Sequence, residues 1–306
     1  MSQFGLVLPN VSFEETNRVS ELTSLAGLAE RLGFTHLWTF DRLFHHNVSA
    51  LEPFTVLSHV AAVTSKVKLG TSVAILTYRN PFILAKVIAT FDALSNGRAV
   101  IGLSLGRYEN EFRASGVDPS KKVRVFVDAL NVMKSLWTGE QVDYDGPFWR
   151  ALGAVQLPVP VQKPHPPILL GGAADGVLKR AARLADGWIG GGMLTPEELR
   201  AKYRIVLEEA DKIGRKNKPI LGKILYVNVN NDEIEAAAYL KKCFKRYYGT
   251  EIEIERYAAV GPPDRCVSTI KKYLDAGADL LALAPIPTTH DHVETLWNEV
   301  LSTFMR

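Results

Sequence analysis

The feature that most constrains this chain is the regular alternation of short apolar runs with longer segments of helical periodicity. Strands that are apolar on both faces are typical of a parallel sheet covered on both sides. Eight runs have this character: residues 4–8, 36–40, 68–74, 99–103, 168–170, 188–189, 221–228 and 279–284. The segments that show the spacing of one helix face are residues 17–32, 52–64, 81–94, 177–184, 196–213, 232–247, 263–276 and 293–304. The alternation predicts an α/β protein with parallel strands.

Eight strands, each followed by a helix, predict a closed (β/α)8 TIM barrel. The length of 306 residues fits a single domain that spans residues 1–306. A doubly wound open sheet is the alternative, and it requires a glycine fingerprint at the first strand–helix turn. Residues 9–12 of that turn read Pro-Asn-Val-Ser and contain no glycine. The barrel is therefore favoured.

Two stretches interrupt the repeat. Residues 104–120 are polar and follow the fourth predicted strand, whereas residues 139–167 are rich in proline, glycine and aromatic residues. Connections of this length in a compact domain are usually functional or disordered. The aromatic side chains Tyr144, Phe148 and Trp149 favour an ordered insertion before strand five, such as a small hairpin. Because this insertion lies at the bottom face of a barrel, we expect it to have a structural role or to form a subunit contact.

Composition excludes several classes of partner. The formal net charge is only +3, and we find no basic cluster, so a nucleic-acid partner is not expected. Two cysteines, Cys243 and Cys266, cannot form a disulfide framework and are predicted to be packed thiols in a reducing compartment. No basic leader is visible, and no apolar run approaches the ~20 residues that cross a bilayer. We expect a cytoplasmic protein without a membrane partner.

The barrel prediction also selects candidate site residues, because the loops at the C-terminal ends of the strands build the site in this fold. Strand by strand, these residues are Asp41, Arg42, His45 and His46; Ser72, Val73, Ile75 and Tyr78; Gly106, Arg107 and Asn110; Gly171, Gly172, Ala173 and Ala174; and Gly190 and Gly191. Gly171 and Gly172 lie between a strand and a helix, where bare backbone N–H groups bind an anion such as a phosphate. Two tight turns of the barrel are the alternative interpretation.

The histidines do not indicate a metal site. His45 and His46 are adjacent and point apart, and no Asp, Glu or Cys residues with ligand spacing surround them. We therefore expect no metal and interpret this segment as a polar loop that lines a pocket. His36 lies in an apolar run and is expected to be a hydrogen-bonded core histidine.

Asp41 and Glu109 are a candidate carboxylate pair of the kind that glycosidases use. Arg42 and Arg107 stand beside them in the sequence, so ion pairing is an equally good interpretation. The residues alone leave both alternatives open.

Several blocks along the chain together carry a resemblance to a known family. They are LGTSV at residues 69–73, RNP at 79–81, LA at 84–85, ATFDALSNGR at 89–98, LGF at 32–34, LW at 37–38 with Asp41, ADGW at 185–188 and VGPPD at 260–264. In this order they resemble the bacterial luciferase-like superfamily, and the closing APIP at residues 284–287 looks like the methylenetetrahydromethanopterin reductases. The resemblance implies a TIM-like barrel that binds FMN or the deazaflavin coenzyme F420. Members of the family are two-component flavin monooxygenases or hydride-transferring reductases.

The resemblance also implies roles for individual residues. In the deazaflavin branch a non-proline cis peptide often lies against the ring, and by position it is the Ser72–Val73 bond here. Asp41 and Asn110 match cofactor contacts of that branch. Arg42 and Arg107 occupy the positions where its sugar-phosphate dehydrogenases have a catalytic histidine and glutamate. A guanidinium is not a general acid or base near neutral pH, so the sugar-phosphate reaction is not expected.

We expect Arg42 and Arg107 to bind an anion and to stabilise charge in the transition state. The proton donor, if one is needed, is expected to be His45, His46, Tyr78 or water. Val73, Ile75 and Trp38 supply apolar character for the ring, and Gly106 and Gly190–Gly191 are expected to line the same side of the barrel.

Three functions remain open from the sequence. The first is F420-dependent hydride transfer to or from a small organic substrate, by a protein that we expect to be a homodimer. The second is an FMN-dependent monooxygenase, which needs a separate flavin reductase. The third is a non-catalytic barrel that binds a flavin.

Overall fold

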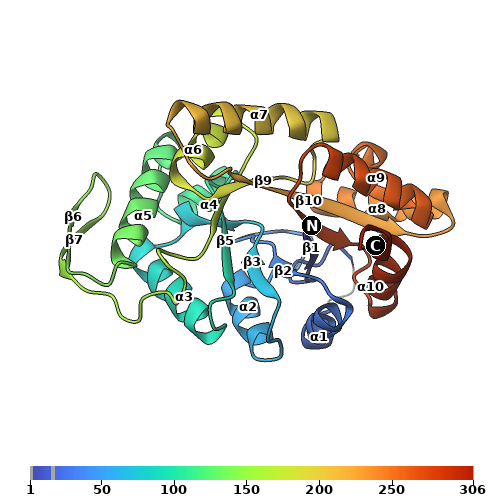
Figure 1. Cartoon of the computed structure of the whole chain (residues 1–306), viewed down its shortest axis with the longest axis horizontal. Coiled ribbons are helices and arrows are strands. Elements are labelled where there is room, and N and C mark those ends of the chain that lie inside the picture. Colours follow the sequence, from blue (N-terminus) through green and yellow to red (C-terminus); the bar gives the residue numbers. More distant parts are fainter. Residues whose placement is uncertain (1–2, 15–17, 306) are drawn as a thin grey trace.

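A computed structural model describes residues 3–14 and 18–305. Eight parallel strands pair in a ring and confirm the predicted closed barrel (Figure 1). In ring order they are β1 (Gln3–Val7), β2 (His36–Thr39), β3 (Lys68–Thr71), β5 (Ala99–Ser104), β8 (Ile168–Gly171), β9 (Gly187–Gly190), β10 (Ile220–Val229) and β12 (Leu280–Pro285). The ring closes because β10 pairs with both β9 and β12, and β12 pairs with β1.

Helices surround the strands in Figure 1. They are α1 (Leu22–Leu32), α2 (Pro53–Ala61), α3 (Pro81–Leu94), α4 (Glu109–Ala114), α5 (Lys122–Leu136), α6 (Asp175–Leu184), α7 (Pro196–Lys212), α8 (Glu233–Tyr248), α9 (Pro263–Asp275) and α10 (His290–Thr295). Local sequence sets several of the boundaries. Asn80 caps α3 before Pro81, Thr195 and Glu198 form a capping box on α7, and Gly33 ends α1 in the left-handed conformation.

Three expectations from the sequence differ from the structure, and a fourth is not tested. Residues 104–120 were expected to be a polar loop, but they contain α4, whose acidic first turn favours a helix start. The third predicted strand, 68–74, is interrupted, so that β3 ends at Thr71 and β4 (Ala74–Ile75) begins after a bulge. The last helix begins at His290 and continues as a π-helix and a 3-10 helix over residues 296–304. The predicted start of the first helix at residue 17 lies outside the described residues.

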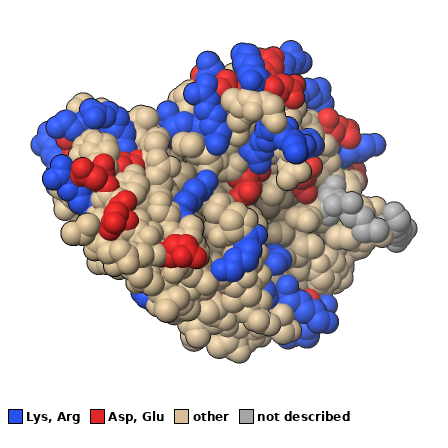
Figure 2. Space-filling view, turned by 60° about the vertical axis from the view of Figure 1, so that its left-hand side comes forward, with Lys and Arg blue, Asp and Glu red and all other residues tan. Residues whose placement is uncertain are grey.

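The insertion before β8 is the small hairpin that the sequence predicts. Its strands β6 (Val142–Asp145) and β7 (Arg150–Ala154) pair antiparallel at the left of Figure 1. Asp128 of α5 anchors the hairpin, because its carboxylate accepts hydrogen bonds from the Tyr144 hydroxyl at 2.6 Å and from the Phe148 N–H at 2.8 Å. Leu152 at the hairpin is 90% exposed. Figure 2 shows a broad area without charged side chains on the lower part of this side of the molecule. The subunit contact stays a prediction.

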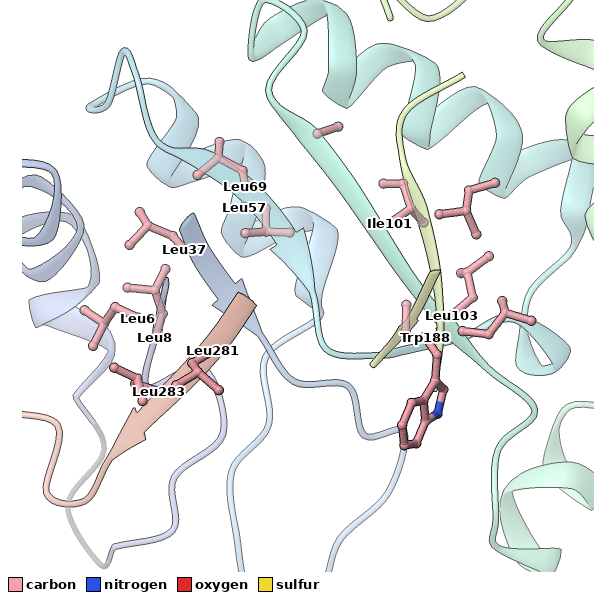
Figure 3. Close-up of a cluster of buried hydrophobic side chains, with 14 of the residues drawn as sticks. Leu6, Leu8, Leu37, Leu57, Leu69, Ile101, Leu103, Trp188, Leu281 and Leu283 are labelled. Carbon is pink, nitrogen blue, oxygen red and sulfur yellow. The ribbon is translucent and has the colours of Figure 1, made fainter. Parts of the chain in front are cut away.

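The apolar core has two layers. The outer layer lies between strands and helices, and Figure 3 shows its side chains from successive strands, among them Leu6, Leu37, Leu69 and Ile101. The inner layer fills the barrel and is centred on Trp38, which is fully buried. Gly5 and Gly70 on the flanking strands leave room for the indole, because a Cβ on either glycine would lie 2.3 Å from it.

The expectations for the two cysteines and for His36 are confirmed. Cys243 and Cys266 are buried free thiols, as predicted. His36 is buried in the barrel, hydrogen-bonded to the Thr35 hydroxyl at 2.9 Å, and burial lowers its pKa to about 4. Among the described residues, no helix is long and apolar enough to cross a bilayer, and no group of three or more potential ligands gathers in a way that would hold a metal ion.

Candidate active site

A cavity of about 530 Å³ opens at the C-terminal ends of the strands, where a barrel of this type places its site. The strand-end loops and α8 supply its walls. Its lining residues are Phe40, Asp41, Arg42, Ser72, Val73, Ile75, Ser104, Leu105, Gly106, Arg107, Tyr108, Gly171, Gly172, Ala173, Ala174, Val177, Gly192, Ile224, Tyr226, Tyr247 and Tyr248. The structure thus brings together eleven of the sequence-predicted residues: Asp41, Arg42, Ser72, Val73, Ile75, Gly106, Arg107, Gly171, Gly172, Ala173 and Ala174.

The floor of the cavity is the bulge between β3 and β4. The Ser72–Val73 peptide bond is cis, as the family resemblance implies. The Val73 side chain lies between two neighbouring strands that carry glycine at this level. A Cβ on Gly102 would lie 2.9 Å from Val73, and one on Gly171 would lie 2.8 Å from it. The two glycines therefore make the space that lets the bulge present Val73 to the cavity.

A buried ion pair holds the bulge in place. One carboxylate oxygen of Asp41 accepts a hydrogen bond from the Ile75 N–H at 2.8 Å and another from Arg79 at 2.6 Å. Arg79 also donates to the Ile75 carbonyl oxygen at 3.0 Å. Asp41 lines the cavity, but its carboxylate is committed to the β4 backbone and to Arg79. These contacts make Asp41 a positioning residue of the bulge, and its contact with a cofactor stays a prediction.

One end of the cavity, which we call the glycine end, consists of Gly171, Gly172, Ala173 and Ala174 between β8 and α6. Gly172 has a φ of +127°, a conformation that favours glycine. Ala174 is the N-cap of α6, and no side chain caps this helix. The N–H groups of Ala173 and Ala174 donate no hydrogen bond to any residue that the structure describes. Uncapped N–H groups and the positive end of the helix dipole together suit an anion.

The loop after β9 closes this side of the cavity, and a buried lysine holds it. Lys223 of β10 donates to the carbonyl oxygens of Gly191 and Gly192 at 2.8 Å and 3.1 Å. Burial lowers the pKa of Lys223 to about 7. The sequence analysis missed this residue, although a single lysine within the apolar run 221–228 is the signal that could have found it. Gly190 and Gly191, two predicted cofactor contacts, do not line the cavity, and Gly190 is buried against Leu199.

The other end, which we call the arginine end, consists of Arg42, Arg107 and Tyr108. The Arg42 guanidinium lies 3.6 Å from the centre of the Tyr108 ring, and that of Arg107 lies 5.7 Å from it. Arg42 donates from Nε to the Phe44 carbonyl oxygen at 2.9 Å, which fixes its side chain across the cavity. Two positive charges therefore meet around one aromatic ring.

A buried glutamate that the sequence analysis did not select supports the arginine end. The Glu111 side chain is fully buried, and its Oε1 lies 3.6 Å from Arg42 Nε and accepts a hydrogen bond from the Phe44 N–H at 3.1 Å. Tyr78 lies behind Gly106, where burial and the neighbouring Glu111 raise the pKa of its hydroxyl. The sequence gives only a weak indication of Glu111, because this residue lies in a polar stretch that resembles a loop.

Tyrosine rings form the wall beside the arginine end, and they were also missed. The hydroxyls of Tyr226 on β10 and Tyr248 on α8 are 2.8 Å apart. Tyr247, one residue earlier on α8, packs against Phe13 with ring centres 4.5 Å apart. The phenol groups of Tyr226 and Tyr248 satisfy each other, so this wall presents mainly apolar ring surface to the cavity.

Four other predicted residues are described but do not line the cavity. The His45 ring stacks on Tyr247 and bonds its carbonyl oxygen at 2.9 Å, so the loop after β2 reaches α8. His46 and Asn110 are exposed on the surface, and Tyr78 is screened by Gly106. The roles of His45, His46 and Tyr78 as proton donors and of Asn110 as a cofactor contact stay predictions, although none of the four lines the cavity.

Comparison with known proteins decides the family. Residues 2–280 match the family described as luciferase-like monooxygenase. The chain belongs to this family. Its similarity to an uncharacterized protein of Mycobacterium tuberculosis is 41% identity over 140 residues, which is 45% of this chain and about half of that protein, 49%.

Relatives of this luciferase-like protein include enzymes with different cofactors. An F420-dependent glucose-6-phosphate dehydrogenase of Nocardia farcinica is 32% identical over 296 residues, covering 85% of this chain and 86% of the relative. The oxygenase component of a flavin-dependent trigonelline monooxygenase of Acinetobacter baylyi is 26% identical and covers 81% of this chain and 71% of the relative. A monooxygenase structure from Streptomyces bottropensis shares the fold, with a TM-score of 0.87, 24% identity and 99% of each chain covered. The family to which the chain belongs thus includes relatives of both kinds.

Proposed function

We propose that this luciferase-like oxidoreductase uses coenzyme F420 to transfer a hydride to or from a small organic substrate. The observation that carries the proposal is the cavity itself, with an apolar floor at Val73 and an uncapped helix N-terminus at one end. The relative with the F420-dependent activity covers 85% of this chain at 32% identity and supports the same cofactor.

The residues present fit such a cofactor. A deazaflavin needs an apolar slot for its ring and an anion site for its phosphate. Val73 and Ile75 at the bulge offer the slot, and the N–H groups of Ala173 and Ala174 would hold the phosphate. Gly171 leaves space between the slot and the phosphate site, because it faces Val73 and has no side chain.

When bound, F420 supplies a ring carbon that accepts or donates a hydride. The chain's own residues bind, orient and exclude water. The Asp41–Arg79 pair fixes the bulge that would hold the ring, and the tyrosine wall would help to exclude water from the cavity. The rings of Tyr108 and Tyr226 would then contact the substrate.

An FMN-dependent monooxygenase is the second candidate, and the relative from Acinetobacter baylyi favours it. FMN would use the same slot and the same phosphate site, and such an enzyme would need a separate flavin reductase. The third candidate, a flavin-binding barrel without catalysis, draws support from the cavity lining, which includes no histidine.

Titration of the purified chain with F420 and, separately, with FMN tests the proposal, with absorbance and fluorescence of the cofactor as readouts. We expect F420 to bind about tenfold or more tightly than FMN. Tighter binding of FMN would instead indicate an FMN-dependent monooxygenase. Hydride transfer is then measured as the loss or recovery of F420 absorbance with substrates, and cofactor binding without any turnover would favour the non-catalytic barrel.

A further inference from the structure

The arginine end of the cavity carries more positive charge than its surroundings neutralise. Three charged side chains line the cavity: Asp41, Arg42 and Arg107. Asp41 is neutralised by Arg79 at 2.6 Å, and Arg42 faces Glu111 at 3.6 Å. Arg107 lies within ion-pairing distance of no carboxylate among the described residues. A net positive charge therefore remains at this end, on the cavity wall.

Arg42 is held with part of its guanidinium unused. Its side chain is 13% exposed, and only Nε donates a hydrogen bond to a described residue. The two terminal amino groups donate none within the described part of the chain. A guanidinium presents its donors in a planar fork that matches the two oxygens of a carboxylate or of a phosphate. An anion at this edge would use donors that the protein leaves open.

Arg42 is separated from the glycine end in the ring of strands. It follows β2, which stands three strands from β8 in ring order, whereas Arg107 follows β5, the strand that pairs with β8. The loop after β2 spans the β1 side, because the His45 ring bonds the carbonyl oxygen of Tyr247 on α8. A cofactor phosphate at Ala174 and an anion at Arg42 therefore occupy two separate sites.

The surroundings of Arg42 indicate what the second anion is attached to. Tyr108 lies against the guanidinium, and the rings of Tyr226, Tyr247 and Tyr248 line the adjoining wall. The Tyr226 and Tyr248 hydroxyls satisfy each other at 2.8 Å, which leaves mostly ring surface for contact. A long hydrophilic tail gains little from such a wall, whereas a compact apolar or aromatic body packs well against it.

We propose that the substrate is an organic anion: its oxyanion binds Arg42 and Arg107, and its apolar or aromatic body packs against Tyr108 and Tyr226. This inference rests on the proposed function, because it places the substrate beside a cofactor bound in the same cavity. It names the chemical class of the substrate, which neither the fold nor the relatives specify for this chain.

Calorimetric titration with simple probes tests the subsite. Benzoate, phenyl phosphate and the neutral analogue benzamide are titrated into the chain saturated with F420, and into the chain alone. We expect both anions to bind about tenfold or more tightly than benzamide, because each gains charge-assisted hydrogen bonds. The preferred anion distinguishes a carboxylate substrate from a phosphate ester. Equal binding of benzoate, phenyl phosphate and benzamide would overturn the proposal.

Variants assign the effect to the arginines. Arg42→Met and Arg107→Met each remove a charge and keep an apolar stem, and Arg113→Met is the matched control. Arg113 is an exposed arginine on α4 that pairs with Glu109 at 2.6 Å outside the cavity. We expect each of the first two variants to weaken binding of the preferred anion about tenfold, while benzamide and F420 affinities stay within twofold. If instead F420 affinity falls and anion affinity holds, the arginines bind the cofactor tail and the proposal is wrong.

A separate control checks that the variants fold, because Arg42→Met leaves Glu111 buried without its cation. The double variant Arg42→Met/Glu111→Gln removes both charges, and Arg107→Met changes only an exposed side chain; thermal unfolding checks each. Anion binding that depends on the arginines in a chain that binds neither F420 nor FMN would leave the subsite standing and refute the proposed function. Cofactor binding with no arginine dependence would refute the subsite alone.

Discussion

The two ends of the cavity differ in the groups that form them: backbone at one end and side chains at the other. The glycine end is made of backbone: its open N–H groups are those of Ala173 and Ala174, and no side chain caps the helix that follows. The arginine end is made of side chains from the loops after β2 and β5, supported by Glu111 of α4 and flanked by tyrosines of β10 and α8. A backbone site tolerates only small residues and recognises charge, whereas a side-chain site can change its ligand by substitution on a constant frame. The comparison assigns the common cofactor to the first end and the particular substrate to the second.

The largest effect is expected from Gly172→Asp at the glycine end. The new carboxylate would stand where we place the cofactor phosphate, and like charges repel strongly in a partly desolvated site. We expect F420 affinity to fall about 100-fold, measured by fluorescence titration. Because Gly172 has a φ of +127°, any side chain there also strains the backbone.

Gly172→Ala is the matched control for that strain. Its Cβ would lie 3.3 Å from Val177 and would add no charge, so we expect F420 affinity to fall several-fold at most. If the alanine variant loses as much affinity as the aspartate variant, the effect is steric and the phosphate lies elsewhere.

A smaller effect is expected from the bulge between the two ends. Arg79→Met leaves the Asp41 carboxylate buried without its cation, and Asp41 is 5% exposed. Breaking a buried pair in this way destabilises a protein by several kcal/mol, and since Arg79 is partly exposed we expect a loss of about 2–3 kcal/mol in the free energy of unfolding. Denaturant unfolding measures it. A variant as stable as the wild type would show that the pair does not hold the bulge.

The smallest effect on binding is expected from Lys223, which supports the glycine end from behind. Its pKa is lowered by burial to about 7 from an ordinary 10.5, so between these values the unfolded chain binds more protons than the folded one. The lysine therefore makes stability rise as pH increases from about 7 to 10.5, by about 1.4 kcal/mol for each pKa unit of difference. Below pH 7 this contribution is constant.

Lys223→Met removes that slope, so the difference in unfolding free energy between wild type and variant should change between pH 7 and pH 9.5. We also expect a few-fold loss of F420 affinity, with benzoate affinity unchanged, because only the Gly191–Gly192 loop loses its support. Parallel pH profiles for the two proteins would contradict this assignment.

The same contrast explains what the sequence could predict. Strand ends and glycine pairs are local patterns, so the barrel, the hairpin and the residues of the glycine end followed from the sequence. The arginine end depends on contacts between distant segments. Tyr247 reaches the cavity because the end of α8 packs against Phe13 in the segment after β1, and Glu111 becomes buried because residues 109–114 form a helix. His45 and Asn110 illustrate the converse: both follow strand ends, but His45 packs against Tyr247 of α8 and Asn110 lies on the exposed side of α4.

The most direct test of the division between the two ends is a crystal structure of the chain with F420 bound. The account predicts that the ring lies against Ser72–Val73, that the phosphate accepts hydrogen bonds from the N–H groups of Ala173 and Ala174, and that the terminal amino groups of Arg42 remain free of the cofactor. A structure in which the acidic tail of F420 occupies Arg42 and Arg107, with the glycine end empty, would contradict it.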